Sequence, residues 1–229
     1  MTAQIPLGIT LRESTSFDTF HPGGNGLLLA QLRAGVKGKG EPFIFLWGVS
    51  GSGKSHLLQA TCRLAASIDR TTAYIPLSES AEFDPDILSD LEHLDLVCID
   101  DLQQIAGQPT WEQALFRLFN RLRDGGSQLL VSADRSPAQL PIGLPDLLSR
   151  LKWGASYQLQ PLDDEARMEA LIASAGQRGM SLPPETAGYI IRHTARDMDS
   201  LQRLLEHLDR ASLAAQRRLT VPFVKSFLK

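Results

Sequence analysis

One glycine-rich run holds the residue types best suited to binding phosphate groups. It consists of Gly48, Val49, Ser50, Gly51, Ser52, Gly53, Lys54 and Ser55. Glycines at positions 51 and 53 allow backbone angles that other residues avoid, so successive N–H groups can point at one anion. Lys54 brings a positive charge for the β- and γ-phosphates, and the Ser55 hydroxyl is a suitable Mg²⁺ ligand. The run therefore predicts a site for nucleotide phosphates.

Two acidic residues follow an apolar run that predicts a buried strand. Asp100 and Asp101 come directly after residues 96–99. In an open parallel sheet, the carboxyl ends of the strands form the edge where ligands bind. We expect Asp100 to hold Mg²⁺ together with Ser55, and Asp101 to orient an attacking water.

A third acid ends another apolar run and leaves two interpretations open. Asp134 lies just beyond residues 128–131, with Ser132 beside it. Either side chain has the chemistry to contact a γ-phosphate or the water. Alternatively, Asp134 simply opens a turn, because Arg135, Ser136 and Pro137 follow it.

The elements that must position these residues alternate between strands and helices. Apolar runs predict strands at residues 43–47, 71–76, 96–99, 128–131 and 155–159. Helical spacing predicts helices at residues 26–36, 54–66, 84–94, 111–123 and 144–151. This alternation predicts an α/β fold, with a five-stranded parallel sheet flanked by helices.

The pattern changes at Pro161, beyond which we expect only helices. They are predicted at residues 163–178, 183–194, 198–216 and 222–228. We therefore divide the chain into a tail of residues 1–15, an α/β domain of residues 16–160 and a helical domain of residues 161–229.

Composition narrows the classes of protein to consider. The 229 residues are 43% hydrophobic and 21% charged, with a formal net charge of −3, which argues against a strongly basic nucleic-acid binder. Cys62 and Cys98 form no C-x-x-C pair, so zinc and disulfide sites are not expected. No apolar run approaches membrane-spanning length and no secretory leader is apparent, so we expect a cytoplasmic protein.

The tail contains a short stretch with the chemistry of a partner-binding peptide. Its amide and apolar side chains are those of Gln4, Ile5, Leu7 and Ile9. An extended peptide of this kind can place apolar anchors in a partner's pocket while the amide hydrogen-bonds nearby. Composition alone also allows a tail that packs on its own domain or stays disordered, and short apolar tails of this kind are common.

Four motifs together resemble a known family. They span residues 51–58, 98–101, 132–137 and 149–154, in this order. The set resembles the AAA+ module of the bacterial replication initiator DnaA over residues 16–229. The resemblance implies a P-loop AAA+ fold followed by a small helical lid domain.

In three features the chain is more similar to the short regulatory members of this family than to the initiator itself. Those members shut the initiator off. The chain ends at residues 223–229, where the initiator would continue into a helix-turn-helix domain. The stretch between Tyr74 and Asp95 is too short for the initiator's extra helical insertion. Residues 4–9 resemble the motif with which those members bind the sliding clamp.

The resemblance also implies roles for individual residues. The glycine-rich run is Walker A, with His56 beside it, and Asp100 and Asp101 are Walker B. Asp134 matches sensor 1, and residues 17–25 match the segment that lines the adenine pocket. Arg150 matches the arginine finger that reaches into a neighbour's nucleotide site. Arg196 matches sensor 2. Without the resemblance, nothing in the sequence would distinguish Arg150 and Arg196 from the other arginines.

The resemblance further implies a regulator of another protein's ATPase. It would hold ADP or ATP with Mg²⁺, bind the DNA polymerase III β sliding clamp through the tail, and present Arg150 to ATP on DnaA. It would contact DNA mainly through the clamp. Whether the protein forms a homodimer is left open by the resemblance. Asp101 is shorter than the glutamate common at this Walker B position, so we expect activation of DnaA rather than strong turnover by the chain itself.

Other interpretations of the phosphate site remain. One is an autonomous AAA+ ATPase of helicase-loader or chaperone type. A second is a nucleoside or metabolite kinase, against which the all-helical end of the chain and the run at residues 149–154 argue. A third is a binding module that uses nucleotide only as a conformational ligand.

Overall fold

The structure is a computed structural model that describes residues 15–194, 197–215 and 218–227. The chain separates into two compact units. Of the described residues, the first unit holds 15–17, Leu27–Gly48 and Lys54–Gln158. The second holds Asp18–Gly26, Val49–Gly53 and the residues from Leu159 onward. The sequence-based division at residue 161 did not anticipate the two short segments that join the second unit.

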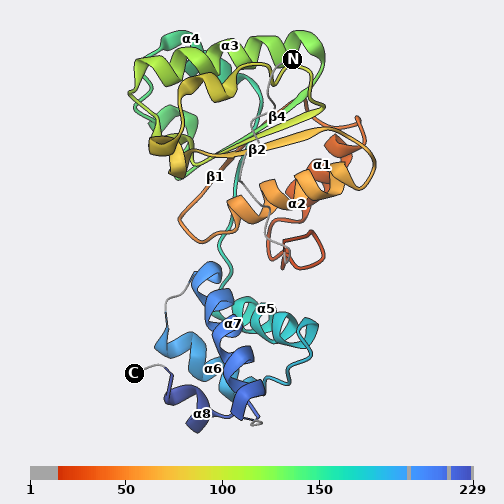
Figure 1. The fold of residues 1–229 in the computed structure, drawn as a ribbon, viewed down its shortest axis with the longest axis vertical. Coiled ribbons are helices and arrows are strands. Elements are labelled where there is room, and N and C mark those ends of the chain that lie inside the picture. Colours follow the sequence, from red (N-terminus) through yellow and green to blue (C-terminus); the bar gives the residue numbers. More distant parts are fainter. Residues whose placement is uncertain (1–14, 195–196, 216–217, 228–229) are drawn as a thin grey trace. The chain divides into compact units, whose positions relative to one another are not determined.

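The first unit is built on a five-stranded parallel sheet, as the sequence predicts (Figure 1). The strands lie in the order β2-β3-β4-β1-β5. Their bounds are Phe43–Trp47 for β1, Thr72–Pro76 for β2, Leu96–Asp100 for β3, Gln128–Ala133 for β4 and Ala155–Gln158 for β5. Every residue of the central strands β3 and β4 is buried, which explains their continuous apolar runs.

Helices cover both faces of this sheet. Helices α1 (Gly26–Val36) and α2 (Lys54–Ala66) lie on one face, and α3 (Pro109–Gly125) and α4 (Pro145–Trp153) lie on the other (Figure 1). The apolar stripe of α3 is buried as its spacing predicts, and Phe119 meets Phe43 of β1 edge to face at 5.0 Å between ring centroids. Each such fully buried side chain contributes about 1.5–3 kcal/mol.

The helix predicted at residues 84–94 is wrong in length and type. The structure has a 3₁₀ turn, η2 (Pro85–Leu88), in which the Asp84 carboxylate accepts a hydrogen bond from the backbone N–H of Asp86 at 3.0 Å. Ser89 is extended and Asp90 has a φ of +61°, so the helix cannot continue. Three further 3₁₀ turns were not predicted: η1 (Leu77–Glu82), η3 (Leu102–Gln104) and η4 (Pro137–Gln139).

The second unit contains the C-terminal helices. They are α5 (Asp164–Gln177), α6 (Pro184–His193), α7 (Met198–Ala215) and α8 (Val221–Lys225). Their own core includes Leu171, Ile190 and Leu205, all fully buried. Asp163 caps α5 by accepting a hydrogen bond from the N–H of Ala166 at 2.8 Å. Among the described helices, none combines the length and apolarity that a membrane crossing requires.

Candidate functional site

The glycine-rich loop connects β1 to α2. Gly51 has a φ of +73° and Gly53 a φ of +100°, both in the region that favours glycine. The N–H of Ser52 donates to the carbonyl of Val49 at 3.3 Å, so the loop turns back on itself. Helix α2 begins at Lys54, directly after the second of these glycines. The first N–H groups of a helix have no partner within the helix itself, and a helix start is therefore suited to an anion.

Lys54 is held inside the first unit with its charge close to carboxylates. The residue is only 7% exposed, and its Nζ donates to the carbonyl oxygen of Gly48 at 2.9 Å. Burial lowers the pKa of Lys54, while Asp101, Asp100 and Asp134 oppose that shift by favouring the charged form. Lys54 and these three acids therefore form one electrostatic cluster.

Asp100 is the last residue of β3, and its carboxylate accepts hydrogen bonds from two hydroxyl groups. It is 1% exposed, and its Oδ2 accepts a hydrogen bond from the Tyr74 hydroxyl of β2 at 2.6 Å. Its Oδ1 accepts a hydrogen bond from the Ser132 hydroxyl of β4. Burial, together with the charge of Asp100, raises the pKa of Tyr74. Tyr74 thus stays a hydrogen-bond donor toward the carboxylate.

Asp101 has an unusual backbone conformation at the same sheet edge. Its φ of +60° and ψ of +48° lie in the left-handed region, which costs a non-glycine residue on the order of 1–2 kcal/mol. Its N–H donates to the Ser132 Oγ at 3.1 Å, and its Oδ1 accepts from the Gln103 amide at 2.9 Å. Burial, and then the neighbouring charge of Asp100, raise the pKa of Asp101.

Gln103 links the two acidic ends of the strands. While its Nε2 donates to Asp101, its Oε1 accepts the backbone N–H of Asp134 at 3.1 Å. Neither Gln103 nor Tyr74 was predicted from the sequence. Gln103 lies in the unpredicted turn η3, and Tyr74 shows no sign in the sequence beyond its place two residues before the end of β2.

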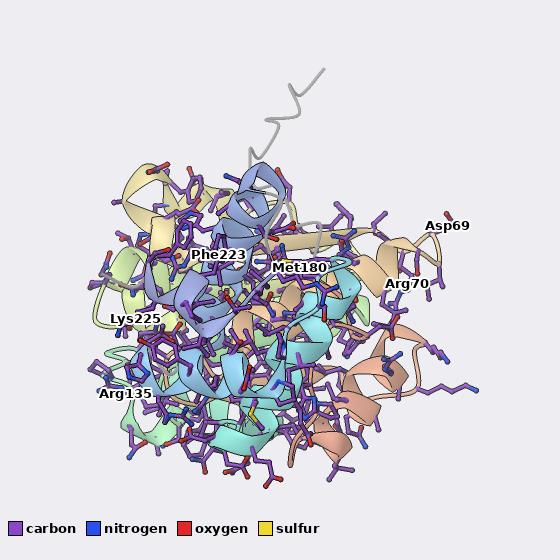
Figure 2. All side chains as sticks on the ribbon, turned by 90° about the horizontal axis from the view of Figure 1, so that it is seen from below. Asp69, Arg70, Arg135, Met180, Phe223 and Lys225 are labelled. Carbon is purple, nitrogen blue, oxygen red and sulfur yellow. The ribbon has the colours of Figure 1, made fainter. Side chains whose placement is uncertain are left out.

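Asp134 lies just beyond β4, as predicted, but its carboxylate is engaged by its neighbour. Arg135 donates from Nε to Oδ1 and from Nη2 to Oδ2, each at 2.8 Å. This pairing holds the pKa of Asp134 below its ordinary value. Arg135 is exposed (Figure 2), so the pair is accessible to a ligand that competes for either partner.

The oxygen atoms at this edge fit a magnesium–nucleotide complex. The candidates are the Ser55 hydroxyl and the Asp100 carboxylate, both hard oxygen ligands. In the described part of the chain, no three His, Cys, Asp or Glu side chains converge into a metal cage. Mg²⁺ usually binds through one or two protein oxygens plus substrate phosphates, so the donor set suits a cation that arrives with a nucleotide.

Arg150 lies on the last turn of α4. Leu147 and Leu151 are fully buried and fasten that helix, whereas Arg150 is half-exposed. Among the described residues, no hydrogen bond or ion pair to its guanidinium is found. Arg196 lies outside the described residues, as do Gln4, Ile5, Leu7 and Ile9.

The segment expected to line the adenine pocket is anchored at both ends. Phe17 is buried in the first unit under the Arg33 guanidinium, 4.6 Å from the ring centroid. Asn25, in the second unit, exchanges two hydrogen bonds with the backbone of Gln160, at 2.9 and 3.0 Å. His56, at the start of α2, lies 2.8 Å from the carbonyl oxygen of Ser16.

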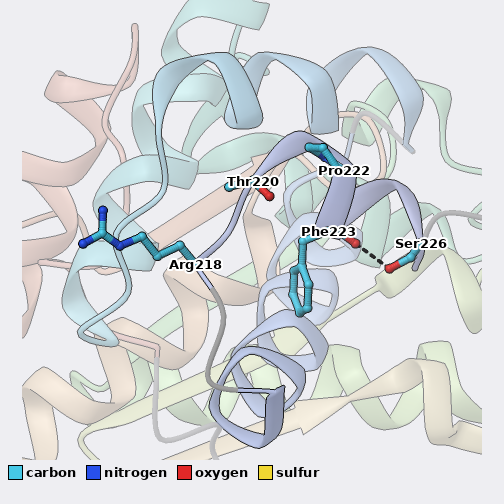
Figure 3. A pocket seen from close by; sticks show the side chains of 5 residues that line it. All are labelled: Arg218, Thr220, Pro222, Phe223 and Ser226. Atoms are coloured by element: carbon cyan, nitrogen blue, oxygen red, sulfur yellow. Dashed lines mark hydrogen bonds between the residues drawn. The ribbon is translucent and has the colours of Figure 1, made fainter.

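A separate hollow of about 410 Å³ lies beside α8 (Figure 3). It is lined by Arg218, Thr220, Pro222, Phe223 and Ser226. None of the residues that the sequence analysis selected contributes to it, and we assign it no part in the site.

Family models match the chain in two consecutive stretches. Residues 11–158 match the bacterial DnaA ATPase domain, and residues 164–228 match the lid domain of Hda. The chain belongs to the DnaA ATPase family. It is an Hda-like, DnaA-homologous AAA+ protein, as the four motifs and the three further features together predict.

Solved structures share the fold of this DnaA homologue. Domain III of Thermotoga maritima DnaA is 23% identical, with a TM-score of 0.81 over 96% of this chain and 100% of that one. AMPPCP-bound DnaA from Aquifex aeolicus is 21% identical, with a TM-score of 0.73 over 87% of this chain and 66% of that one. The Thermotoga maritima RuvB branch migration motor is 17% identical, with a TM-score of 0.68 over 93% of this chain and 70% of that one.

Proposed function

We propose that this protein is a negative regulator of replication initiation that acts on DnaA. Its family membership makes it a DnaA-related replication regulator. The observation that carries the finer proposal is the tandem match, in which a DnaA-type ATPase domain precedes a lid of the Hda type. A similar lid and ATPase domain would let the chain dock against DnaA as one AAA+ subunit docks against another.

The phosphate site would hold ADP or ATP. Lys54 and backbone N–H groups of the glycine-rich loop would bind the phosphates, and Ser55 and Asp100 would hold Mg²⁺. When bound, Mg²⁺ neutralises phosphate charge. The AMPPCP complexes of similarly folded DnaA proteins support nucleotide binding. Arg196 would contact the same nucleotide from the lid.

Arg150 would act on the nucleotide of DnaA rather than on the chain's own. A guanidinium that reaches a γ-phosphate in trans stabilises charge in the transition state, which raises hydrolysis about 10³- to 10⁵-fold in GTPases. A half-exposed arginine on a helix fixed by buried leucines is suited to this, because its backbone is held while its side chain can extend. DnaA-ATP would thereby become DnaA-ADP.

The Arg150→Ala variant tests this proposal. We expect it to bind nucleotide and clamp as the parent does but to lose stimulated hydrolysis of ATP on DnaA, measured as release of labelled phosphate. Arg117→Ala removes an exposed arginine from α3 and serves as the matched control. Undiminished stimulation by Arg150→Ala would refute the role, and appreciable turnover by the chain alone would favour an autonomous ATPase.

A further inference from the structure

The predicted metal ligand Asp100 lies between two strands that each send a hydroxyl to it. The sheet order places β3 between β2 and β4. Tyr74 on β2 pairs in register with Cys98, two residues before Asp100, so the two side chains share one face of the sheet. Ser132 follows Val131, the partner of Ile99, and therefore stands beside Asp100. Register alone thus brings both hydroxyls to one carboxylate.

These two hydrogen bonds use different oxygens of the carboxylate. The Tyr74 hydroxyl donates to Oδ2 at 2.6 Å, and the Ser132 hydroxyl donates to Oδ1. A carboxylate that is held at both oxygens cannot rotate about its terminal bond without breaking a hydrogen bond. An ionised carboxylate has about four lone-pair positions, so two remain for a cation or its water.

Both donors are neutral, which matters for a cation site. A lysine or arginine in the same place would compete with the cation by charge, whereas a hydroxyl only orients the ligand.

We propose that Tyr74 and Ser132 are positioning residues that hold Asp100 in the orientation required by a nucleotide-bound divalent cation. This inference rests on the proposed nucleotide site. Hydrogen-bonding partners that orient a metal ligand typically affect metal affinity 10- to 100-fold when they are removed. Loss of the Tyr74 hydroxyl should therefore weaken nucleotide binding in the presence of magnesium. Binding without magnesium, which depends on Lys54 and the loop, should not change.

The test compares nucleotide affinity with and without magnesium. A fluorescent ADP analogue is titrated into the full chain in MgCl₂ and again in EDTA, and the ratio of the two Kd values is the magnesium gain. We expect Tyr74→Phe to reduce this gain about 10-fold or more while leaving the Kd in EDTA unchanged. Tyr157→Phe removes a hydroxyl from the other edge strand, β5, and should leave both values as they are.

Each outcome decides the inference. An unchanged magnesium gain in Tyr74→Phe, or an equal weakening of both Kd values, would overturn it while leaving the nucleotide site intact. Absence of binding by the parent chain in both buffers would overturn the proposed function as well. If Tyr74→Phe does not fold, as judged by circular dichroism, Ser132→Ala must show the same selective loss. Ser132→Thr, which keeps a hydroxyl, should restore the gain.

Discussion

Asp95 lies just before β3, at the end of the sheet opposite to Asp100. Its Oδ2 accepts hydrogen bonds from both the N–H and the hydroxyl of Thr71, each at 2.8 Å. Arg70 lies beside it, with its Nε 3.6 Å from Oδ1, and donates to the carbonyl of Val36 at 2.7 Å. This cluster ties the starts of β2 and β3 to the end of α1. Its residues stabilise the sheet at the end opposite to Asp100.

These contacts predict a pH-dependent loss of stability in Asp95→Asn. The two Thr71 hydrogen bonds, and then Arg70, hold the pKa of Asp95 below its ordinary value. The ionised form therefore stabilises the fold above about pH 4, and that contribution is lost as the pH falls through the lowered pKa. Because the side chain is 43% exposed, we expect only about 1 kcal/mol at pH 7.

Thermal melts at several pH values check this expectation. A loss of about 1 kcal/mol corresponds to a Tm lower by about 2–4 °C for a chain of this size. The difference should close as the pH drops below about 4. Asp69→Asn, in the exposed turn that precedes Arg70, is the control (Figure 2). An equal difference at pH 7 and pH 3 would contradict the ionic origin.

Single residues differ in how far their sequence context reveals them. Lys54 and Asp100 were predictable because a glycine loop and a strand end fix where they lie. Tyr74 and Gln103 were not, because their contacts with Asp100 and Asp101 depend on strand order and on a 3₁₀ turn. The pairing of Asp134 with Arg135 was also missed, since adjacent charges in a sequence do not reveal whether their side chains meet.

At the scale of elements, one buried carboxylate joins α3 to the helix that carries Arg150. Glu112 is 1% exposed, and its Oε1 accepts the N–H groups of Gly107 at 2.7 Å and Gly143 at 3.0 Å. Its Oε2 accepts the N–H of Leu144 at 2.7 Å. Leu144 is the N-cap of α4 and has no capping side chain of its own, so Glu112 of α3 satisfies donors at the start of α4.

Glu112→Ala should destabilise the fold through this junction. Three backbone donors lose their partner, and leaving buried donors unsatisfied costs about 1–3 kcal/mol. Urea denaturation measures the change in the free energy of unfolding. Glu185→Ala, at an exposed acid in the first turn of α6, should stay within about 0.5 kcal/mol of the parent. A similarly small effect of Glu112→Ala would show that the junction does not depend on this carboxylate.

Elements with strong periodicity were the predictable ones. Helix α3 buries its apolar stripe from Trp111 to Leu122, and the predicted start of α2 at Lys54 agrees with the structure. The helix predicted after Asp84 failed because Pro85 and an aspartate cap also begin a 3₁₀ turn. The residues that begin a helical segment do not determine whether it ends after one turn or continues as an α-helix.

At the scale of the whole molecule, the proposal requires a tether that lies outside the described residues. Gln4 and Leu7 supply the amide and one apolar anchor of the predicted clamp motif. We expect Gln4→Ala combined with Leu7→Ala to abolish retention on beads that carry the sliding clamp, while nucleotide affinity stays unchanged. Thr2→Ala with Thr10→Ala changes the tail outside the anchors and is the control. Full retention of the Gln4/Leu7 variant would refute the motif.

The fold class of the molecule could be predicted from its sequence. The assignment of chain segments to its two units could not. Alternating strands and helices predicted the parallel sheet, and the change of pattern at Pro161 predicted the helical end. The assignment of Asp18–Gly26 to the second unit reflects contacts such as those of Asn25 with Gln160. Residues 135 positions apart give no local signal of such a contact.

The most direct test of the proposed function follows the nucleotide on DnaA. DnaA loaded with labelled ATP is incubated with this protein and with DNA-loaded clamp, and the fraction converted to ADP is measured over time. We predict rapid conversion only when both are present, and slow conversion when either is left out. Equal persistence of ATP on DnaA in every mixture would contradict the account and leave a nucleotide-binding protein without this role.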